Sequence, residues 1–203
     1  AAASYFYQQH DQHFLHLNEA HMVLLPKKED AQSINDFRPI SLTLYCKVVL
    51  QTACYKTVHT SQHNYLKISG AFIKRRSIQD NFLYTQNFIR DLHRTKQPGL
   101  FLKLDIAKAF DSVRWDFLLE VLQQFGFPPK WCSWVSMLLA TSSTSVLLNG
   151  SKGLWFKHFR GLRQGDPLSP MLFILAMEPL QRLFDIATAQ GYLSPLGGHV
   201  TRL

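Results

Sequence analysis

The chain has 203 residues, of which 46% are hydrophobic and 18% are charged, and this balance excludes disorder for most of it. Lys and Arg number 22 against 14 Asp and Glu, and the net charge of +8 favours a polyanionic partner, nucleic acid before an acidic membrane. No apolar run reaches about 18 residues and three cysteines cannot all pair, so we expect no membrane segment and an intracellular, reducing compartment, nucleus or cytoplasm.

The N-terminal part begins with residues 1–19, which are polar and rich in histidine and predict a poorly defined lead-in. Ala20–Leu25 is a short apolar run before a proline and two lysines, which predicts a strand ending in a basic turn. Further on, Pro39 restricts Arg38 to extended backbone, so the guanidinium can project away from the chain. Leu44–Leu66 carries a partial apolar stripe at helical spacing and predicts a helix.

The middle of the chain combines a predicted helix and a predicted strand. Ile78–Leu92 places apolar residues on one helix face. Leu100–Ile106 alternates with a period of two, which is typical of a strand with one face on a core. Asp105 leaves that strand near its end, on the face opposite the leucines. A carboxylate there can hold a divalent cation or can cap the next element, and spacing alone does not separate the two readings.

Two helices and a hairpin are predicted next. Phe117–Phe125 fits one helix face, and Gly126 with the prolines after it ends that helix. Pro129 suits the first position of a second helix that continues to about Leu138. Asn149-Gly150 lies between two apolar runs, which predicts a hairpin.

The segment Arg160–Pro170 is dense in glycine and proline and predicts a defined loop. Ser169 and Pro170 are typical of a helix start, and Pro179 predicts a kink within that helix. Composition alone supports only a plain loop before a capped helix.

Several segments together resemble the reverse transcriptases of LINE-type (non-LTR) retrotransposons, especially those of plants. Asp105–Val113 reads Asp-Ile-Ala-Lys-Ala-Phe-Asp-Ser-Val and is similar to the first catalytic block of that family. Ser33–Leu42 resembles the family's Asp-x-Arg-Pro-Ile-Ser-Leu block, and Gly161–Pro170 its Gly-x-x-Gln-Gly-x-x-x-Ser-Pro block. The chain departs from the family pattern at Ser69 and Arg75, where Gln and Gly are usual.

The resemblance implies an α+β fold: the fingers and a partial palm of a right-hand polymerase, with a small antiparallel sheet packed with helices. Residues 20–99 would form a fingers-like region. Residues 100–203 would form a partial palm, truncated before the Phe/Tyr-Ala-Asp-Asp block and without a thumb.

The resemblance also implies an RNA-directed DNA polymerase that uses an RNA template, a DNA primer, dNTP and two Mg²⁺ ions. Asp105 and the Ile106 backbone carbonyl would hold metal, and Lys27 and Arg38 would contact the triphosphate, although both cations also read as ordinary surface charge. Phe110 would stack under the sugar and exclude a 2′ hydroxyl, while Gln164 and Gly165 would lie against the nascent base pair. Asp111 matches a family position to which no chemistry is assigned.

No Asp-Asp pair occurs anywhere in the sequence, so the other metal ligands are missing. We therefore expect this chain to be catalytically inactive by itself. Two alternatives are a non-catalytic nucleic-acid-binding remnant and a fragment that does not fold stably. The sequence does not identify which proteins, if any, this chain binds.

Overall fold

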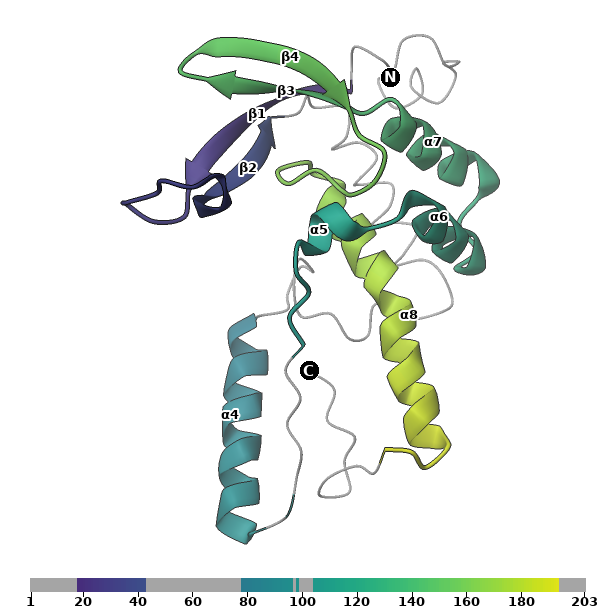
Figure 1. Ribbon diagram of the computed structural model, residues 1–203. Helices are drawn as coiled ribbons and strands as arrows, with labels where there is room; N and C mark the ends of the chain where they lie inside the picture. Colours follow the sequence, from purple (N-terminus) through teal and green to yellow (C-terminus); the bar gives the residue numbers. More distant parts are fainter. Residues whose placement is uncertain (1–17, 43–77, 97, 99–103, 194–203) are drawn as a thin grey trace. The chain divides into compact units, whose positions relative to one another are not determined.

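The computed structural model describes residues 18–42, 78–96, 98 and 104–193 (Figure 1). The predicted α+β class is confirmed. Within this part the elements are, in order, β1 (Glu19–Pro26), the 3-10 turn η2 (Ile34–Asp36), β2 (Phe37–Leu42), α4 (Ile78–Thr95), α5 (Ala109–Ser112), α6 (Trp115–Gln124), α7 (Pro129–Ala140), β3 (Ser143–Leu148), β4 (Ser151–Lys157) and α8 (Ser169–Ala189). Most of the lead-in, the predicted helix at Leu44–Leu66, the position of Arg75 and residues 100–103 lie outside the described residues.

These elements belong to two compact units. The first contains the four strands, α5, α6, α7 and the beginning of α8 as far as Ala176. The second contains α4, the segment up to Ala107 and α8 from Met177 onward.

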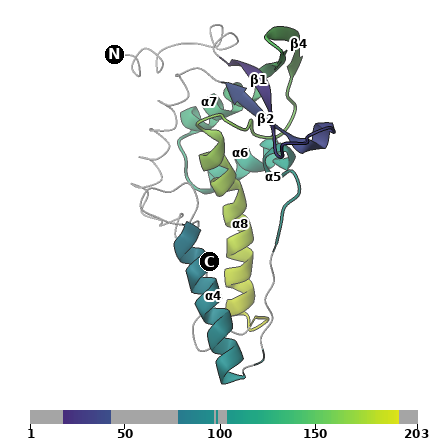
Figure 2. The ribbon, with the colours of Figure 1, turned by 90° about the vertical axis from the view of Figure 1, so that its left-hand side faces the viewer.

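The sheet of the first unit has the order β2-β1-β3-β4 (Figure 1), and Figure 2 shows β1 and β2 side by side in it. β1 is antiparallel to β2, and β3 is antiparallel to β4. β1 and β3 are parallel, so the sheet is mixed rather than wholly antiparallel. Parallel neighbours need a long crossover between them, and the chain from β2 to β3 supplies it.

Strand alternation gives this sheet two faces. We call one of them the cleft face. Cross-strand pairing places these residues on it: Ala20, Met22, Leu24, Pro39, Ser41, Thr144, Val146 and Phe156. We call the other the opposite face. The same pairing places these residues on it: Glu19, His21, Val23, Leu25, Arg38, Ile40, Ser143, Ser145, Leu147, Lys152, Trp155 and Lys157.

The predicted hairpin between β3 and β4 is confirmed. Asn149 and Gly150 have φ of 50° and 80°, the left-handed pair that a tight hairpin turn with the right strand twist requires. The ladder is interrupted by a bulge where Val146 of β3 opposes two residues of β4. A Cβ on Gly153 would lie 3.2 Å from the Val146 carbonyl oxygen, so the absent side chain relieves crowding at the bulge.

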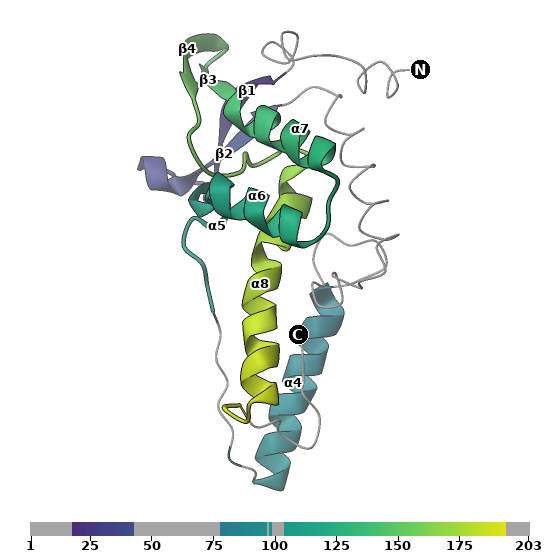
Figure 3. The ribbon, with the colours of Figure 1, turned by 90° about the vertical axis from the view of Figure 1, so that its right-hand side faces the viewer.

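Helices α6 and α7 pack against each other and carry much of the core of the first unit (Figure 3). Both were predicted from their apolar spacing, and Pro129 occupies the first turn of α7 as expected. Gly126, with φ of +72°, follows the end of α6. The larger buried apolar side chains are Leu118, Val121, Leu122, Phe125, Phe127, Trp131, Val135, Leu138, Leu139, Leu162, Leu168, Met171, Leu172, Ile174 and Leu175. Burying each of them contributes about 1.5–3 kcal/mol before entropy is counted.

In the second unit, α4 runs from Ile78 to Thr95 and confirms the helix predicted for this segment. Among its described side chains none is buried, and Phe82 is 68% exposed. Tyr84 and Phe88 stack on one another along the helix, with ring centroids 6.4 Å apart. α8 is assigned as one helix through Pro179, so a kink there stays a prediction. Of the helices described here, none combines the length and the apolar character needed to cross a membrane.

The strand predicted for Leu100–Ile106 is not present in its described part. Leu104, Asp105 and Ile106 carry no regular structure, and Leu104 and Ile106 are 57% and 42% exposed rather than set against a core. The physical reason is pairing: every described strand ladder joins β1, β2, β3 and β4, so these three residues have no strand partner in the described part.

Candidate functional site

A loop rich in glycine, residues 160–168 and called here the glycine loop, is hydrogen-bonded to the turn that carries α5. The Leu162 amide donates to the Phe110 carbonyl, and the Gly161 amide donates to the Val113 carbonyl, both at 2.8 Å. These two bonds place the glycine loop directly against the Ala-Phe-Asp segment that the sequence singled out.

Gly161 makes this contact sterically feasible. Its φ is +81°, and a Cβ on it would lie 2.8 Å from the Asp111 carbonyl oxygen and 2.9 Å from the Asp111 Cα. Real Cβ atoms do not approach backbone this closely, so only glycine fits here. The Gly161 carbonyl in turn accepts a hydrogen bond of 2.8 Å from the indole Nε1 of Trp115.

The other end of the glycine loop is attached to β2. The Ser41 amide donates to the Gln164 carbonyl at 2.7 Å. Gly165 has φ of +88°, and a Cβ on it would lie 2.6 Å from the Ser41 carbonyl oxygen and 3.0 Å from Cγ2 of Ile40. The close backbone approach expected of Gly165 therefore exists, and in this structure it is made to β2.

A buried arginine anchors the middle of the loop. Nη1 of Arg163 donates to the carbonyls of Asn18 at 2.7 Å and Ser143 at 3.2 Å, and its Nη2 donates to Oδ1 of Asn18. The same Nη2 lies 3.5 Å from Oδ2 of Asp166, and both side chains of this ion pair are more than nine-tenths buried. The Asn18 amide group donates in turn to Oγ1 of Thr141 at 2.9 Å. A buried charge is tolerated only when it is paired and hydrogen-bonded, and this network meets that condition.

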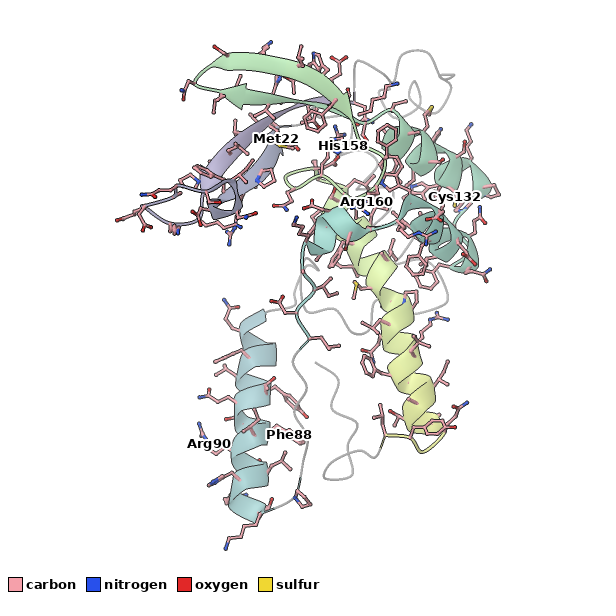
Figure 4. All side chains as sticks on the ribbon, viewed as in Figure 1. Met22, Phe88, Arg90, Cys132, His158 and Arg160 are labelled. Atoms are coloured by element: carbon pink, nitrogen blue, oxygen red, sulfur yellow. The ribbon has the colours of Figure 1, made fainter. Side chains whose placement is uncertain are left out.

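Between the cleft face of the sheet, the start of α5 and the glycine loop lies a cleft of about 310 Å³, within the range of roughly 300–1,000 Å³ that small-molecule sites occupy. Its lining residues are Met22, Pro39, Ser41, Lys108, Asp111, His158, Arg160, Gly161, Leu162, Arg163 and Gln164. Figure 4 labels Met22, His158 and Arg160, which come from β1 and from the segment after β4.

One polar group in the cleft is buried without a partner. Ser41 is 2% exposed, and its hydroxyl has no hydrogen-bond partner among the described residues. An unsatisfied buried hydroxyl carries a desolvation cost of about 1–3 kcal/mol, which a ligand in the cleft could remove.

Lys108 adds strained backbone to the same place. It is the residue before α5 and has φ of 50° and ψ of 44°, a left-handed conformation that is uncommon for lysine. The exposed side chain of Lys108 and that of Arg160 bring positive charge to a cleft whose lining includes one carboxylate, Asp111.

A separate hollow of about 450 Å³ lies along α6 and α7, with Cys132 and Phe127 among its lining residues. Burial raises the pKa of the Cys132 thiol, and its Sγ lies 3.8 Å from the Phe127 carbonyl. A thiol in this environment stays protonated near neutral pH and is a poor nucleophile. This hollow contains none of the residues predicted for function.

The predicted site residues do not all lie at the cleft. Asp111 and Gln164 line the cleft. Phe110 and Gly165 flank it without lining it: the Phe110 ring stacks on Phe173 of α8, with centroids 4.7 Å apart and planes 18° from parallel. Half of the predicted set is thus brought together around one loop.

Lys27 and Arg38 are not among the cleft residues. The Lys27 ammonium donates to the Asn35 carbonyl at 2.7 Å and so is held within the β1–β2 turn. Arg38 is exposed and pairs with Leu25 on the opposite face of the sheet.

The turn that holds Lys27 is organised by Asp36. The Ser33 amide, followed by the Lys28 ammonium 3.1 Å away, holds the pKa of the Asp36 carboxyl below its usual value. Ser33 and Asp36 form a capping box, in which each side chain accepts from the backbone near the other.

Asp105 and Ile106 belong to the second unit and are both exposed. Within the described ranges there is no cluster of three or more His, Cys, Asp or Glu side chains of the kind that holds a metal ion. One exposed carboxylate is too few for a divalent cation, which takes six or more oxygen ligands. The described residues therefore do not fit a complete metal site.

Sequence reasoning missed several residues of the cleft: Ser41, Lys108, His158, Arg160 and Arg163. For Arg163 a signal was present, since an Arg and an Asp three residues apart inside a Gly- and Pro-rich loop suggest an internal ion pair. For His158, whose Nε2 lies 2.6 Å from Oγ1 of Thr144, the sequence contains no comparable signal.

Comparison with known proteins identifies a family to which this sequence is similar. The sequence model described as "Reverse transcriptase (RNA-dependent DNA polymerase)" matches residues 25–193. A Xenopus laevis relative, the Transposon TX1 uncharacterized 149 kDa protein, is 32% identical over 173 residues, which is 81% of this chain and 13% of the relative. The Pol polyprotein of the type-2 retrotransposable element R2DM from Drosophila melanogaster is 31% identical over 163 residues, 80% of this chain and 15% of that polyprotein. The chain thus spans about a seventh of the length of these relatives.

Among solved structures, the apo telomerase of Candida tropicalis truncated from its C-terminal domain superposes with a TM-score of 0.57 at 14% sequence identity. The match covers 85% of this chain and 40% of that one. At this identity the likeness speaks for the fold alone, and it agrees with the fingers and palm of a polymerase.

Proposed function

Because the chain belongs to the reverse transcriptase (RNA-dependent DNA polymerase) family, and is a domain of the non-LTR retrotransposon kind, we propose that its cleft binds an incoming dNTP opposite a template base. The RNA template, the DNA primer and the dNTP are proposed partners, since the chain spans only a small share of its relatives.

One observation supports this proposal above the others: the glycine loop is fixed at both ends, to α5 by Leu162 and to β2 by Gln164. The backbone carbonyl of Gln164 accepts from the Ser41 amide, and Gln164 is among the residues that line the cleft. The side-chain amide of Gln164 can donate and accept, as base and sugar recognition requires. The unpartnered Ser41 hydroxyl beside it favours a polar ligand.

The proposed roles of the remaining residues follow from chemistry. Phe110 presents an aromatic ring beside the cleft that would exclude a 2′ hydroxyl by contact. Lys108 and Arg160, which the sequence did not indicate, would supply the cationic groups nearest to a bound triphosphate. Lys27 and Arg38, held away from the cleft lining here, remain proposed phosphate contacts for which the chain must rearrange.

Reverse transcriptases as a family use a divalent metal ion, and Mg²⁺ with Asp105 and the Ile106 carbonyl as ligands stays a proposal. The described residues do not complete such a site. The proposal for this chain therefore concerns binding and positioning, which its own residues can perform.

The test uses the 203-residue chain and a labelled RNA–DNA hybrid with a recessed, chain-terminated 3′ end. We expect the dNTP that complements the next template base to strengthen hybrid binding more than a mismatched dNTP. Gln164→Ala should reduce that difference about fivefold, because one buried hydrogen bond is worth about 1 kcal/mol. Fluorescence anisotropy measures both affinities.

The matched control is Gln190→Ala, which removes an exposed glutamine just after α8 and should leave the difference between the two dNTPs unchanged. If the wild-type chain binds the hybrid equally with either dNTP, the cleft does not select nucleotides and the proposal is wrong.

We further expect the purified chain to show no primer extension with Mg²⁺ and dNTP, because its sequence contains no Asp-Asp pair. Extension by purified material would contradict this. Hybrid binding without extension would instead favour the alternative of a non-catalytic nucleic-acid-binding protein.

A further inference from the structure

The edge strand β4 exposes aromatic and basic side chains that neither the core nor the cleft uses. All seven residues of β4 are exposed, and Trp155 is 47% exposed although it is a large aromatic residue. Isolated exposed hydrophobic residues are ordinary, but an aromatic side chain between two lysines on one strand is a specific arrangement.

The bulge in β4 determines which of these side chains share a face. Trp155 pairs with Ser145 and Lys157 with Ser143, so both lie on the opposite face of the sheet. Without the bulge, Lys152 would fall on the other side, being an odd number of residues from Trp155. Because β4 has one extra residue there, Lys152 pairs with Leu147 and joins the same face.

Trp155 is held in place on that face by β1. Its ring lies 5.3 Å from the His21 ring, centroid to centroid, with the planes 37° apart. One side of the indole therefore has a partner, while nearly half of the residue remains exposed to bind something else.

In the sequence segment that contains Lys152, Trp155 and Lys157, every charged residue is positive. From Val121 to Gly165 the sequence has no Asp or Glu and has five Lys or Arg. On the opposite face, Glu19 is in register with Ser143 and Lys157 and is the single carboxylate of the described strands there. A positive surface with an aromatic platform complements a flexible polyanion whose bases are free to stack.

We propose that Lys152, Trp155 and Lys157 form a binding surface for single-stranded nucleic acid on the opposite face of the sheet. A base stacks on the free side of the Trp155 indole, and the two lysines contact phosphates on either side of it. Met22 and Ser41, which line the cleft, lie on the other face of the same sheet, so this surface is distinct from the cleft.

A second reading of the two lysines is that they protect an unpaired sheet edge from pairing with another chain. The two readings differ in outcome. Edge protection predicts self-association when the lysines are removed, with nucleic-acid affinity unchanged, whereas a binding surface predicts loss of affinity.

The test measures binding of the 203-residue chain to a labelled 12-nucleotide oligouridine, with no primer or dNTP present, so its result does not depend on the cleft proposal. Trp155→Ala should weaken binding about fivefold or more, while Trp155→Phe should retain most of it. Lys152→Ala with Lys157→Ala should lower the slope of log affinity against log salt by about 1.4, for two lost phosphate contacts.

Leu154→Ala is the control for loss of an exposed apolar side chain, since Leu154 is 92% exposed at the bulge. Arg90→Ala with Arg94→Ala on α4 is the control for loss of two charges and should leave the salt slope unchanged. Thermal melting of each variant shows whether lost affinity comes from unfolding or from a lost contact. If Trp155→Ala does not fold, Trp155→Phe and the double lysine variant still test the proposal. Unchanged affinity in the lysine and Trp155 variants, or equally tight binding to a blunt duplex of the same length, would overturn the proposal.

Discussion

Gly161 and Gly165 adopt positive φ where neighbouring backbone leaves no room for a side chain, whereas Gly126 adopts positive φ in open space. The distinction matters because a glycine can be required by its dihedral angle alone or by its dihedral angle together with a contact. In the glycine loop both requirements apply, and they fall on the two residues that lie closest to the backbone of Asp111 and Ser41.

We predict that Gly161→Ala destabilises the protein more than Gly126→Ala. Both variants carry the cost of a left-handed alanine, about 1–2 kcal/mol. Only Gly161→Ala also brings a Cβ to 2.8 Å from the Asp111 carbonyl, which adds about 1–3 kcal/mol. Urea unfolding gives both free energies, and equal losses would mean that the loop relaxes away from α5.

Removing the Arg163 side chain should be more costly than breaking an exposed ion pair. Arg163→Leu removes the buried cation that faces the buried Asp166 carboxylate, for which we expect a loss of about 3–5 kcal/mol in the free energy of unfolding. Arg114→Ala breaks the exposed pair with Asp116 and is the matched comparison, with a much smaller expected loss. Chemical denaturation of the two variants side by side measures the difference, and similar losses would show that burial of Arg163 has little energetic weight.

At the scale of elements, the turn between β1 and β2 should respond to acid. The pKa of Asp36 is lowered in the folded chain, so its stabilising contribution is present above the unfolded value of 3.8 and is lost as pH falls through the lower folded value. We expect the amides of Gln32 and Ser33, which donate to Asp36, to exchange faster in that acid range. Asp36→Asn should make their exchange independent of this titration, while Asp30→Asn on the same turn should not. Hydrogen exchange followed by NMR is the measurement.

The elements that the sequence predicted are those with local causes. The helices α6 and α7 follow from apolar spacing and proline position, and the β3–β4 hairpin follows from Asn149-Gly150. The parallel pairing of β1 with β3 could not be predicted, because no local signal links Glu19 to Ser143. The strand predicted for Leu100–Ile106 was wrong in its described part, Leu104–Ile106, because alternation was present in the sequence but no described strand pairs with these residues.

In the candidate site, too, residues in short motifs could be predicted, whereas residues brought in by strand pairing could not. Gln164, Gly165 and Asp111 were found from short motifs, and their surroundings confirm a defined loop. Ser41 and His158 reach the cleft through sheet pairing and chain path, which no motif encodes. Arg38 illustrates the converse: its extended backbone was predicted, but the face of the sheet on which it lies depends on register with Leu25.

At the scale of the whole molecule, the two units differ in burial. The first unit has a core of fully buried side chains such as Leu118 and Met171. In α4, by contrast, no described side chain is buried. The local free energy of unfolding increases with the number of buried apolar contacts, so we expect the two units to unfold separately.

We therefore predict that backbone amides in α4 exchange with deuterium much faster than those in α6 and α7 of the same sample. Mass spectrometry on peptides from each helix measures this directly. A single, uniform protection level across α4, α6 and α7 would contradict the prediction and would indicate that the chain unfolds as one cooperative body.

The parallel alignment of β1 with β3 joins residues 124 positions apart, from Glu19 with Ser143 to Val23 with Leu147. On the ribosome, β1 and β2 therefore emerge long before the strand that completes their sheet. Until then they are the only described strands of the sheet that exist, and a two-stranded ribbon is marginal in water. The described sheet is complete only once synthesis has passed Lys157. Aggregation therefore competes with folding over that interval, and a pause in translation between β2 and β3 would be the most harmful one.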